Sequence, residues 1–150
     1  MNYDSKYTIF EIMEKKKIDV LISWSGNNYC ATSVGEDING AVIVTNKSLQ
    51  GAKDDFVESL EFHVEGMLYA GDTVPEWLQN KAYEINYTFD ISALLHSLDK
   101  ILTRSAISRV TGINERQLGH YASGHRKPRK EQQRRIVNGI HEIGETLLQV

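Results

Sequence analysis

The sequence predicts an α+β protein built from two units: a βββαβ unit, followed by an all-α unit of about four helices. Apolar residues alternate or follow helical spacing up to residue 90, and only helical spacing remains from residue 91 onward. The charge changes at the same place. Residues 1–90 carry 15 acidic and 7 basic side chains, a net charge of -8, while residues 91–150 carry 5 and 10, a net charge of +5. Such asymmetry indicates that only the second half faces a polyanion.

Three strands are expected at the start of the first unit, residues 17–90. Ile18, Val20, Ile22 and Trp24 alternate with less apolar residues, which is typical of a strand with one buried face. Gly26-Asn27-Asn28 suits a tight turn, so residues 29–34 should form the returning strand. Residues 41–45 are rich in β-branched side chains and predict a third strand. Residues 1–16 are predicted to be an N-terminal extension, either a short helix or a loose arm.

A long amphipathic helix follows, from a cap at Ser48 to an end near Ala70-Gly71. Its apolar side should pack on the strands before it; that side consists of Ala52, Phe56, Leu60, Val64 and Met67, with Val57 and Leu68 beside them. Its other side is acidic and consists of Asp54, Asp55, Glu58, Glu61 and Glu65. Residues 72–81 are expected to form a loop anchored by Trp77. Residues 83–90 then alternate strictly between aromatic or apolar and polar types, which predicts the fourth strand, with Tyr83, Tyr87 and Phe89 in the core.

The second unit, residues 91–150, contains two short capped helices around a tight turn. Thr103 can cap the first helix and Asn114 the second. Between them, Gly112 permits a sharp turn, and Ile113 can fill the space between the two helices. This arrangement is that of a helix-turn-helix, whose second helix enters the major groove of DNA. The side chains expected to read bases are Glu115, Arg116, Gln117 and His120. Those expected to bind phosphate are Thr103, Arg104, Asn114, Arg126, Lys127, Arg129 and Lys130. A helical hairpin with a basic, solvated face is the alternative.

The motifs in this segment also resemble a known family. Leu102-Thr103, Gly112 and Gly124-His125-Arg126-Lys127-Pro128 stand where the phage-repressor-like (Xre) transcription regulators have their Leu-Thr, Gly and Gly-basic-Pro motifs. The resemblance covers roughly residues 91–148 and implies binding to double-stranded operator DNA. Thr111 departs from the pattern, because an apolar residue is usual there.

The order of the two units resembles the HicB antitoxin family, in which Gly26-Asn27-Asn28-Tyr29 would be the Gly-rich hairpin followed by Tyr. The resemblance implies a partial ribonuclease-H-like first unit that neutralises a small, basic, RNA-cleaving toxin of the HicA type. It also implies autoregulation of the operon by a homodimer or higher oligomer. The family's Pro and Gly-Cys pattern before the third strand is absent, and Asn46-Lys47-Ser48 replaces its Gly-Asp-Thr. The acidic side of the long helix, Asp54, Asp55, Glu58, Glu61 and Glu65, is the expected toxin contact, because complementary charge speeds association.

Two other functions remain open. A stand-alone regulator would use the first unit to oligomerise or to sense a ligand. A nuclease would need carboxylates around two metal ions, for which Asp19, Glu58 or Glu61, and Asp90 are the candidates. Otherwise no metal or cofactor is expected, since the histidines are scattered and Cys30 is alone. We expect the candidate carboxylates to be surface groups and the protein to be non-enzymatic. With no secretory signal or transmembrane run in the sequence, we expect it to be cytoplasmic, and associated with the bacterial nucleoid when bound to DNA. A dimer contact is expected along Ile136, Ile140, Ile143 and Leu147.

Overall fold

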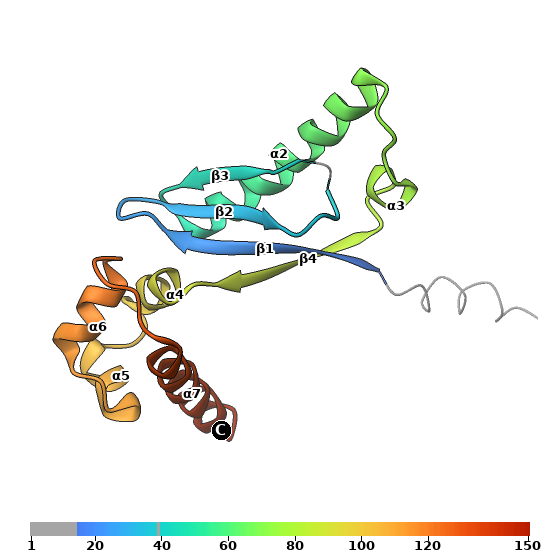
Figure 1. Ribbon diagram of the computed structural model, residues 1–150. Coiled ribbons are helices and arrows are strands. Elements are labelled where there is room, and N and C mark those ends of the chain that lie inside the picture. Colours follow the sequence, from blue (N-terminus) through green and yellow to red (C-terminus); the bar gives the residue numbers. More distant parts are fainter. Residues whose placement is uncertain (1–14, 39) are drawn as a thin grey trace, which may run out of the picture.

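The computed structural model describes residues 15–38 and 40–150 and has the predicted α+β organisation (Figure 1). Its first part is a four-stranded mixed sheet with the strand order β3-β2-β1-β4. The strands are β1 (Lys16–Trp24), β2 (Tyr29–Val34), β3 (Ile43–Asn46) and β4 (Tyr83–Phe89). The first three form an antiparallel meander, and β4 lies parallel to β1 on its other side. The expected extension, residues 1–16, lies outside the described residues except for its last two.

Helix α2 (Leu49–Ala70) lies along one face of the sheet, as its amphipathic pattern predicts. The Ser48 hydroxyl accepts a hydrogen bond from the Gly51 amide at 2.9 Å, which caps the first turn. Gly71, with φ of 81°, ends the helix in the left-handed region that favours glycine. The α2 side chains that are buried against the sheet are Ala52, Phe56, Leu60 and Met67. The packing is strongest on β2 and β3, so the inward side chains of β4 are only half-buried.

The segment between α2 and β4 corrects one prediction. A loop anchored by Trp77 was expected, but a single helical turn, α3 (Glu76–Gln79), forms there. Leu78 is the residue that this turn buries, with 2% of its surface exposed, while Trp77 is half-buried. The Trp77 ring stands edge-on to Tyr83 with 6.3 Å between ring centroids. A four-residue turn has no room for a helical period, which is why the sequence pattern gave no sign of it.

Four helices follow at the end of the sheet where β4 finishes: α4 (Ile91–Leu98), α5 (Arg104–Thr111), α6 (Glu115–Ala122) and α7 (Lys130–Leu147). They enclose a small core of their own, formed by Ile91, Leu95, Ile107, Ile113, Leu118, Tyr121, Ala122 and Ile136. We call residues 15–90 the sheet unit and residues 91–150 the helical unit. Within the described residues, no helix combines the length and apolar character that crossing a bilayer would require.

The two units meet where α4 lies against β1. The Trp24 ring at the end of β1 stacks on the His96 ring of α4, with centroids 3.6 Å apart and planes inclined by 18°. Tyr29 of β2 meets both rings edge-on. Asp90 joins the units directly, because its carboxylate accepts a hydrogen bond from the Ala93 amide and so caps α4 one residue after β4 ends.

Candidate nucleic-acid interface

The helices α5 and α6 are separated by three residues, and a side chain caps the start of each helix. The Thr103 hydroxyl accepts from the Ala106 amide at 3.1 Å, and the Asn114 side-chain oxygen accepts from the Gln117 amide at 2.8 Å. Both predicted caps are therefore present. Their oxygens are engaged within the chain, so a phosphate near these helix ends would meet the remaining backbone amides of the first turns.

The turn is closed by Gly112 and Ile113 in the way the sequence predicts. Gly112 has φ of 68°, in the left-handed region that a side chain would strain. Ile113 is 3% exposed and belongs to the core of the helical unit. The short connection and the buried plug hold α5 and α6 in one fixed arrangement.

Thr111 stands where an apolar residue was expected, and the structure shows how the hydroxyl is accommodated. The side chain is buried, with 6% of its surface exposed. Its hydroxyl donates to the Ile107 carbonyl at 2.7 Å and accepts from the Ile113 amide at 3.2 Å. A buried polar group that makes both of its hydrogen bonds carries little penalty, so this departure is compatible with a stable turn.

Arg135 of α7 has a structural role that the sequence pattern does not predict. Its guanidinium donates from Nε and Nη2 to the Thr111 carbonyl, at 3.1 and 2.9 Å. A cation at the carboxyl end of α5 also complements the dipole of that helix. Nothing in the local pattern distinguishes Arg135 from its basic neighbours, because the contact joins residues 24 positions apart.

Arg104, expected to bind phosphate, is partly engaged within the chain. Its Nη2 lies 3.3 Å from a carboxylate oxygen of Asp99. Its Nη1 lies so close to Gly119 of α6 that a β-carbon there would come within 2.9 Å. Arg104 therefore lies between α5 and α6, and a phosphate contact would have to share the guanidinium with Asp99.

The four residues of α6 that are predicted to read bases form two pairs that differ in solvent exposure. Glu115 and Arg116 are exposed. Gln117 and His120 are half-buried, and the Gln117 amide donates to the Tyr121 hydroxyl at 2.6 Å. Arg116 is thus the base-reading candidate whose donors are least engaged.

His120 lies in a positively charged environment. Its ring is 5.4 Å from that of His125, between centroids. Loss of hydration lowers the pKa of His120, and the positive charges of Arg126, His125 and Arg116 lower it further. At neutral pH its imidazole is therefore protonated less often than that of an unperturbed histidine.

A run of exposed cations follows α6: Arg126, Lys127, Arg129 and Lys130, which we call the basic segment. None of the four takes part in an ion pair in the described part of the chain. The ion pairs within the helical unit there are those of Arg104 and His96 with Asp99. The Arg126 amide donates to the His120 carbonyl at 3.1 Å, which ties the start of this segment to α6. The basic segment is therefore held next to the exposed face of α6 with its charges unneutralised.

The five acidic residues of α2 that are predicted to contact a toxin fall into two groups. Three have a partner within the chain, and two have none within the described residues. Asp54 accepts from Gln50, Asp55 accepts from Asn46 on β3, and Glu61 forms a 2.6 Å ion pair with Lys81. Glu58 and Glu65 are exposed and have no hydrogen-bond or ion-pair partner within the described residues.

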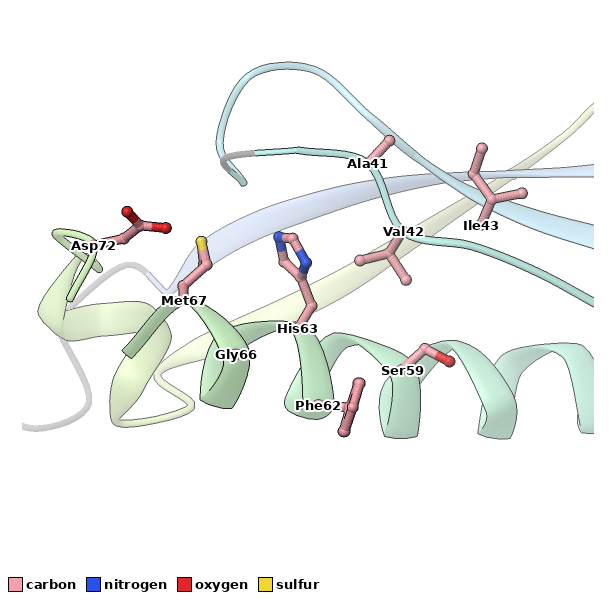
Figure 2. Close-up of a pocket in the computed structure, with 9 residues that line it drawn as sticks. All are labelled: Ala41, Val42, Ile43, Ser59, Phe62, His63, Gly66, Met67 and Asp72. Atoms are coloured by element: carbon pink, nitrogen blue, oxygen red, sulfur yellow. The ribbon is translucent and has the colours of Figure 1, made fainter. Parts of the chain in front are cut away.

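Two exposed aromatic residues share this side of α2 and were not predicted as contact residues. Phe62 is 77% exposed and Tyr69 is 96% exposed. Figure 2 shows Phe62 projecting from α2 away from the strands, at the rim of a shallow hollow between α2 and β3. With Glu58 and Glu65 they lie at spacings of four, three and four, so they form one stripe along the helix. We call these four residues the α2 stripe.

The carboxylates of the nuclease hypothesis are not brought together. Asp19 accepts from the Asn86 side chain at 2.7 Å on the sheet face opposite α2, while Asp90 caps α4. Glu58 lies on the solvent side of α2, and Glu61 is paired with Lys81. Among the described residues, no three His, Cys, Asp or Glu side chains lie close enough together to hold a metal ion.

Comparison of the chain with protein-family models, curated proteins and solved structures finds no match.

Proposed function

We propose that this chain is a DNA-binding transcriptional regulator of the antitoxin type. In this proposal α5 and α6 form a helix-turn-helix that binds operator DNA, and the sheet unit neutralises a small, basic, RNA-cleaving toxin. The observation that carries the DNA-binding part is the placement of the basic segment beside the exposed face of α6. Unpaired cations release counterions from duplex DNA, and exposed polar side chains on a helix can reach base edges.

Arg116 is the sharpest test of base reading. Arg116→Ala should weaken operator binding by about 1–3 kcal/mol and change binding to random duplex little, because a bidentate contact to guanine depends on sequence. Arg134→Ala, which removes another exposed arginine, on α7, is the matched control. The operator can be selected from genomic fragments, and affinities measured by fluorescence anisotropy at fixed salt. Equal losses on operator and random DNA would reject direct reading by Arg116.

The antitoxin part is supported by the α2 stripe in addition to the family resemblance. Exposed aromatic residues among carboxylates suit a basic protein partner, since aromatic anchors dominate binding energy and charges steer the encounter. Phe62→Ala with Tyr69→Ala should weaken binding to a small basic protein encoded beside this gene by at least about 2 kcal/mol. Ile101→Ala, at an apolar residue 74% exposed in the helical unit, should leave that affinity unchanged.

The measurement is calorimetric titration with a catalytically inactive form of that neighbouring protein. Binding that is insensitive to the double substitution would place the partner elsewhere on the sheet unit. No binding at all would favour a stand-alone regulator.

The end of α7 supports a homodimer. Ile136, expected at a dimer contact, is instead fully buried in the core of the helical unit, and Ile140 packs against that core. Leu147 and its neighbour Leu148 are 66% and 86% exposed. A second copy could cover these side chains. A two-fold dimer would read two half-sites about 34–36 Å apart, one turn of the duplex.

A further inference from the structure

A cavity of about 540 Å³ lies where the sheet unit and the helical unit meet. The sheet unit contributes Leu21, Trp24 and Phe89 to its lining. The helical unit contributes Tyr121 of α6 and Val137 of α7. Sites for small molecules are typically apolar, between about 300 and 1,000 Å³, and found between domains, so this cavity has the size and position of a ligand site.

Two residues of the basic segment, Arg126 and Lys127, also line the cavity. Neither has a carboxylate partner in the described part of the chain. The acidic residue in the lining is Asp90, whose carboxylate is engaged by the Ala93 amide as the cap of α4. The cavity therefore combines apolar and aromatic walls with two cations and one carboxylate, an excess of one positive charge.

The hollow between α2 and β3 lacks this combination of apolar walls and cations. Figure 2 shows its lining, in which Phe62, Met67 and Val42 occur without any lysine or arginine. Its volume is about 440 Å³, and Asp72 adds a negative charge. An anionic ligand would find no lysine or arginine there.

We propose that the cavity between the units binds a small organic anion with an apolar or aromatic body, and that this ligand opposes DNA binding. The body would lie among Leu21, Trp24 and Val137, and the anionic group would pair with Arg126 and Lys127. These two cations are also the expected partners of phosphate, so ligand and DNA compete for them. By linkage, DNA weakens ligand binding by the same factor as the ligand weakens DNA binding. The competition rests on the proposed DNA-binding function, whereas ligand binding does not.

Two dyes of similar body and different charge test the binding step. The probes are 8-anilino-1-naphthalenesulfonate and the uncharged N-phenyl-1-naphthylamine, titrated into the full-length Trp77→Phe chain. This chain keeps Trp24, in the cavity lining, as its one tryptophan. The sulfonate should bind saturably, quench Trp24 and show at least tenfold higher affinity than the neutral dye. Equal affinities would overturn the assignment of an anion site.

Variants locate the site. Leu21→Glu puts a carboxylate into the cavity and should weaken sulfonate binding at least tenfold. Val34→Glu introduces the same change at a residue of the same sheet face that is 50% exposed and outside the cavity, and it should have no effect. Arg126→Gln with Lys127→Gln should remove the preference for the charged dye while the neutral dye still binds. Circular dichroism establishes that each variant is folded. Unchanged sulfonate affinity in Leu21→Glu would overturn the site.

The competition is a separate measurement. Saturating sulfonate dye should weaken operator binding at least threefold in the parent chain and not in Leu21→Glu. If the dye binds as expected but DNA affinity is unchanged, ligand regulation is refuted while the site stands. If no DNA binds under any condition, the proposed function fails, and the dye titrations still decide whether the anion site exists.

Discussion

The sheet unit and the helical unit differ in what their charged side chains do. On α2, three of the five acidic residues predicted to bind a partner have a hydrogen-bond or ion-pair partner within the chain. In the basic segment, none of the four cations forms an ion pair within the described residues. Two of the partners of the α2 carboxylates, Gln50 and Asn46, are neutral and leave the carboxylate charge in place, while Lys81 offsets the charge of Glu61. The carboxylates of α2 are thus more engaged within the chain than the cations of the basic segment.

The units also differ in how they are held together. The sheet unit depends on pairing between distant residues, such as Lys16 with Tyr83. The helical unit depends on caps and turns within a few residues, supplemented by Arg135. Substitutions that remove charges, contacts between copies or single hydrogen bonds should therefore change DNA binding, self-association and stability to different extents in the two units.

Removing the basic segment's charges should have the largest effect. Substitution of all four residues, Arg126, Lys127, Arg129 and Lys130, by Gln should lower DNA affinity by about 10³-fold at moderate salt. The reason is that each phosphate contact contributes about 0.9 to the slope of log affinity against log salt, so the slope should fall by about 3 to 4. Anisotropy titrations at several salt concentrations measure both quantities.

The matched control removes four exposed lysines from the sheet unit: Lys15, Lys16, Lys17 and Lys47, each replaced by Gln. The net charge changes equally, yet the slope should fall by less than 1. A comparable fall in both variants would mean that DNA binding responds to net charge alone, and the contrast between the units would disappear.

The end of α7 should give the next largest effect. Leu147→Glu with Leu148→Glu introduces charges into the proposed dimer contact and should weaken self-association at least about 100-fold, since buried unpaired charges are costly. Sedimentation velocity over a range of concentrations measures it. Ile101→Glu, at another exposed apolar residue of the helical unit, should leave the association unchanged. A parent chain that is monomeric at all concentrations would contradict the prediction.

The sequence was sufficient for features set by neighbouring residues and insufficient for those set by distant ones. Ser48, Thr103 and Asn114 were recognised as caps because a cap needs only a side-chain oxygen and an amide three residues away. The parallel pairing of β4 with β1 was not predicted, since no local pattern specifies which strand lies beside which. The bond from Arg135 to Thr111 and the engagement of Glu61 by Lys81 were missed for the same reason.

Removal of the Thr111 hydroxyl should have an intermediate effect, a loss of folding stability. Thr111→Val keeps the shape of the side chain but leaves the Ile113 amide without its acceptor, so the free energy of unfolding should fall by about 1–3 kcal/mol. Thr45→Val, at an exposed threonine of β3 whose hydroxyl makes no hydrogen bond in the described structure, is the control and should be nearly neutral. Urea denaturation measures both. A Thr111→Val chain as stable as its parent would mean that the turn does not depend on this residue.

Substitution of His120 should have the smallest effect, a change in how operator affinity depends on pH. Because the folded chain lowers the pKa of His120 below its unfolded value of about 6.5, stability is fully present above that pH and is lost as the pH falls toward the folded pKa. DNA phosphates beside α6 would raise the pKa again, so binding would take up a proton. Operator affinity should then increase as the pH falls from 7.5 to 5.5, by less than about tenfold per pH unit, as a single linked proton allows. His120→Gln should flatten this slope, whereas His141→Gln, an exposed histidine of α7, should not. An unchanged slope in His120→Gln would place this face of α6 away from the phosphates, or assign the proton to His125, which His125→Gln would reveal.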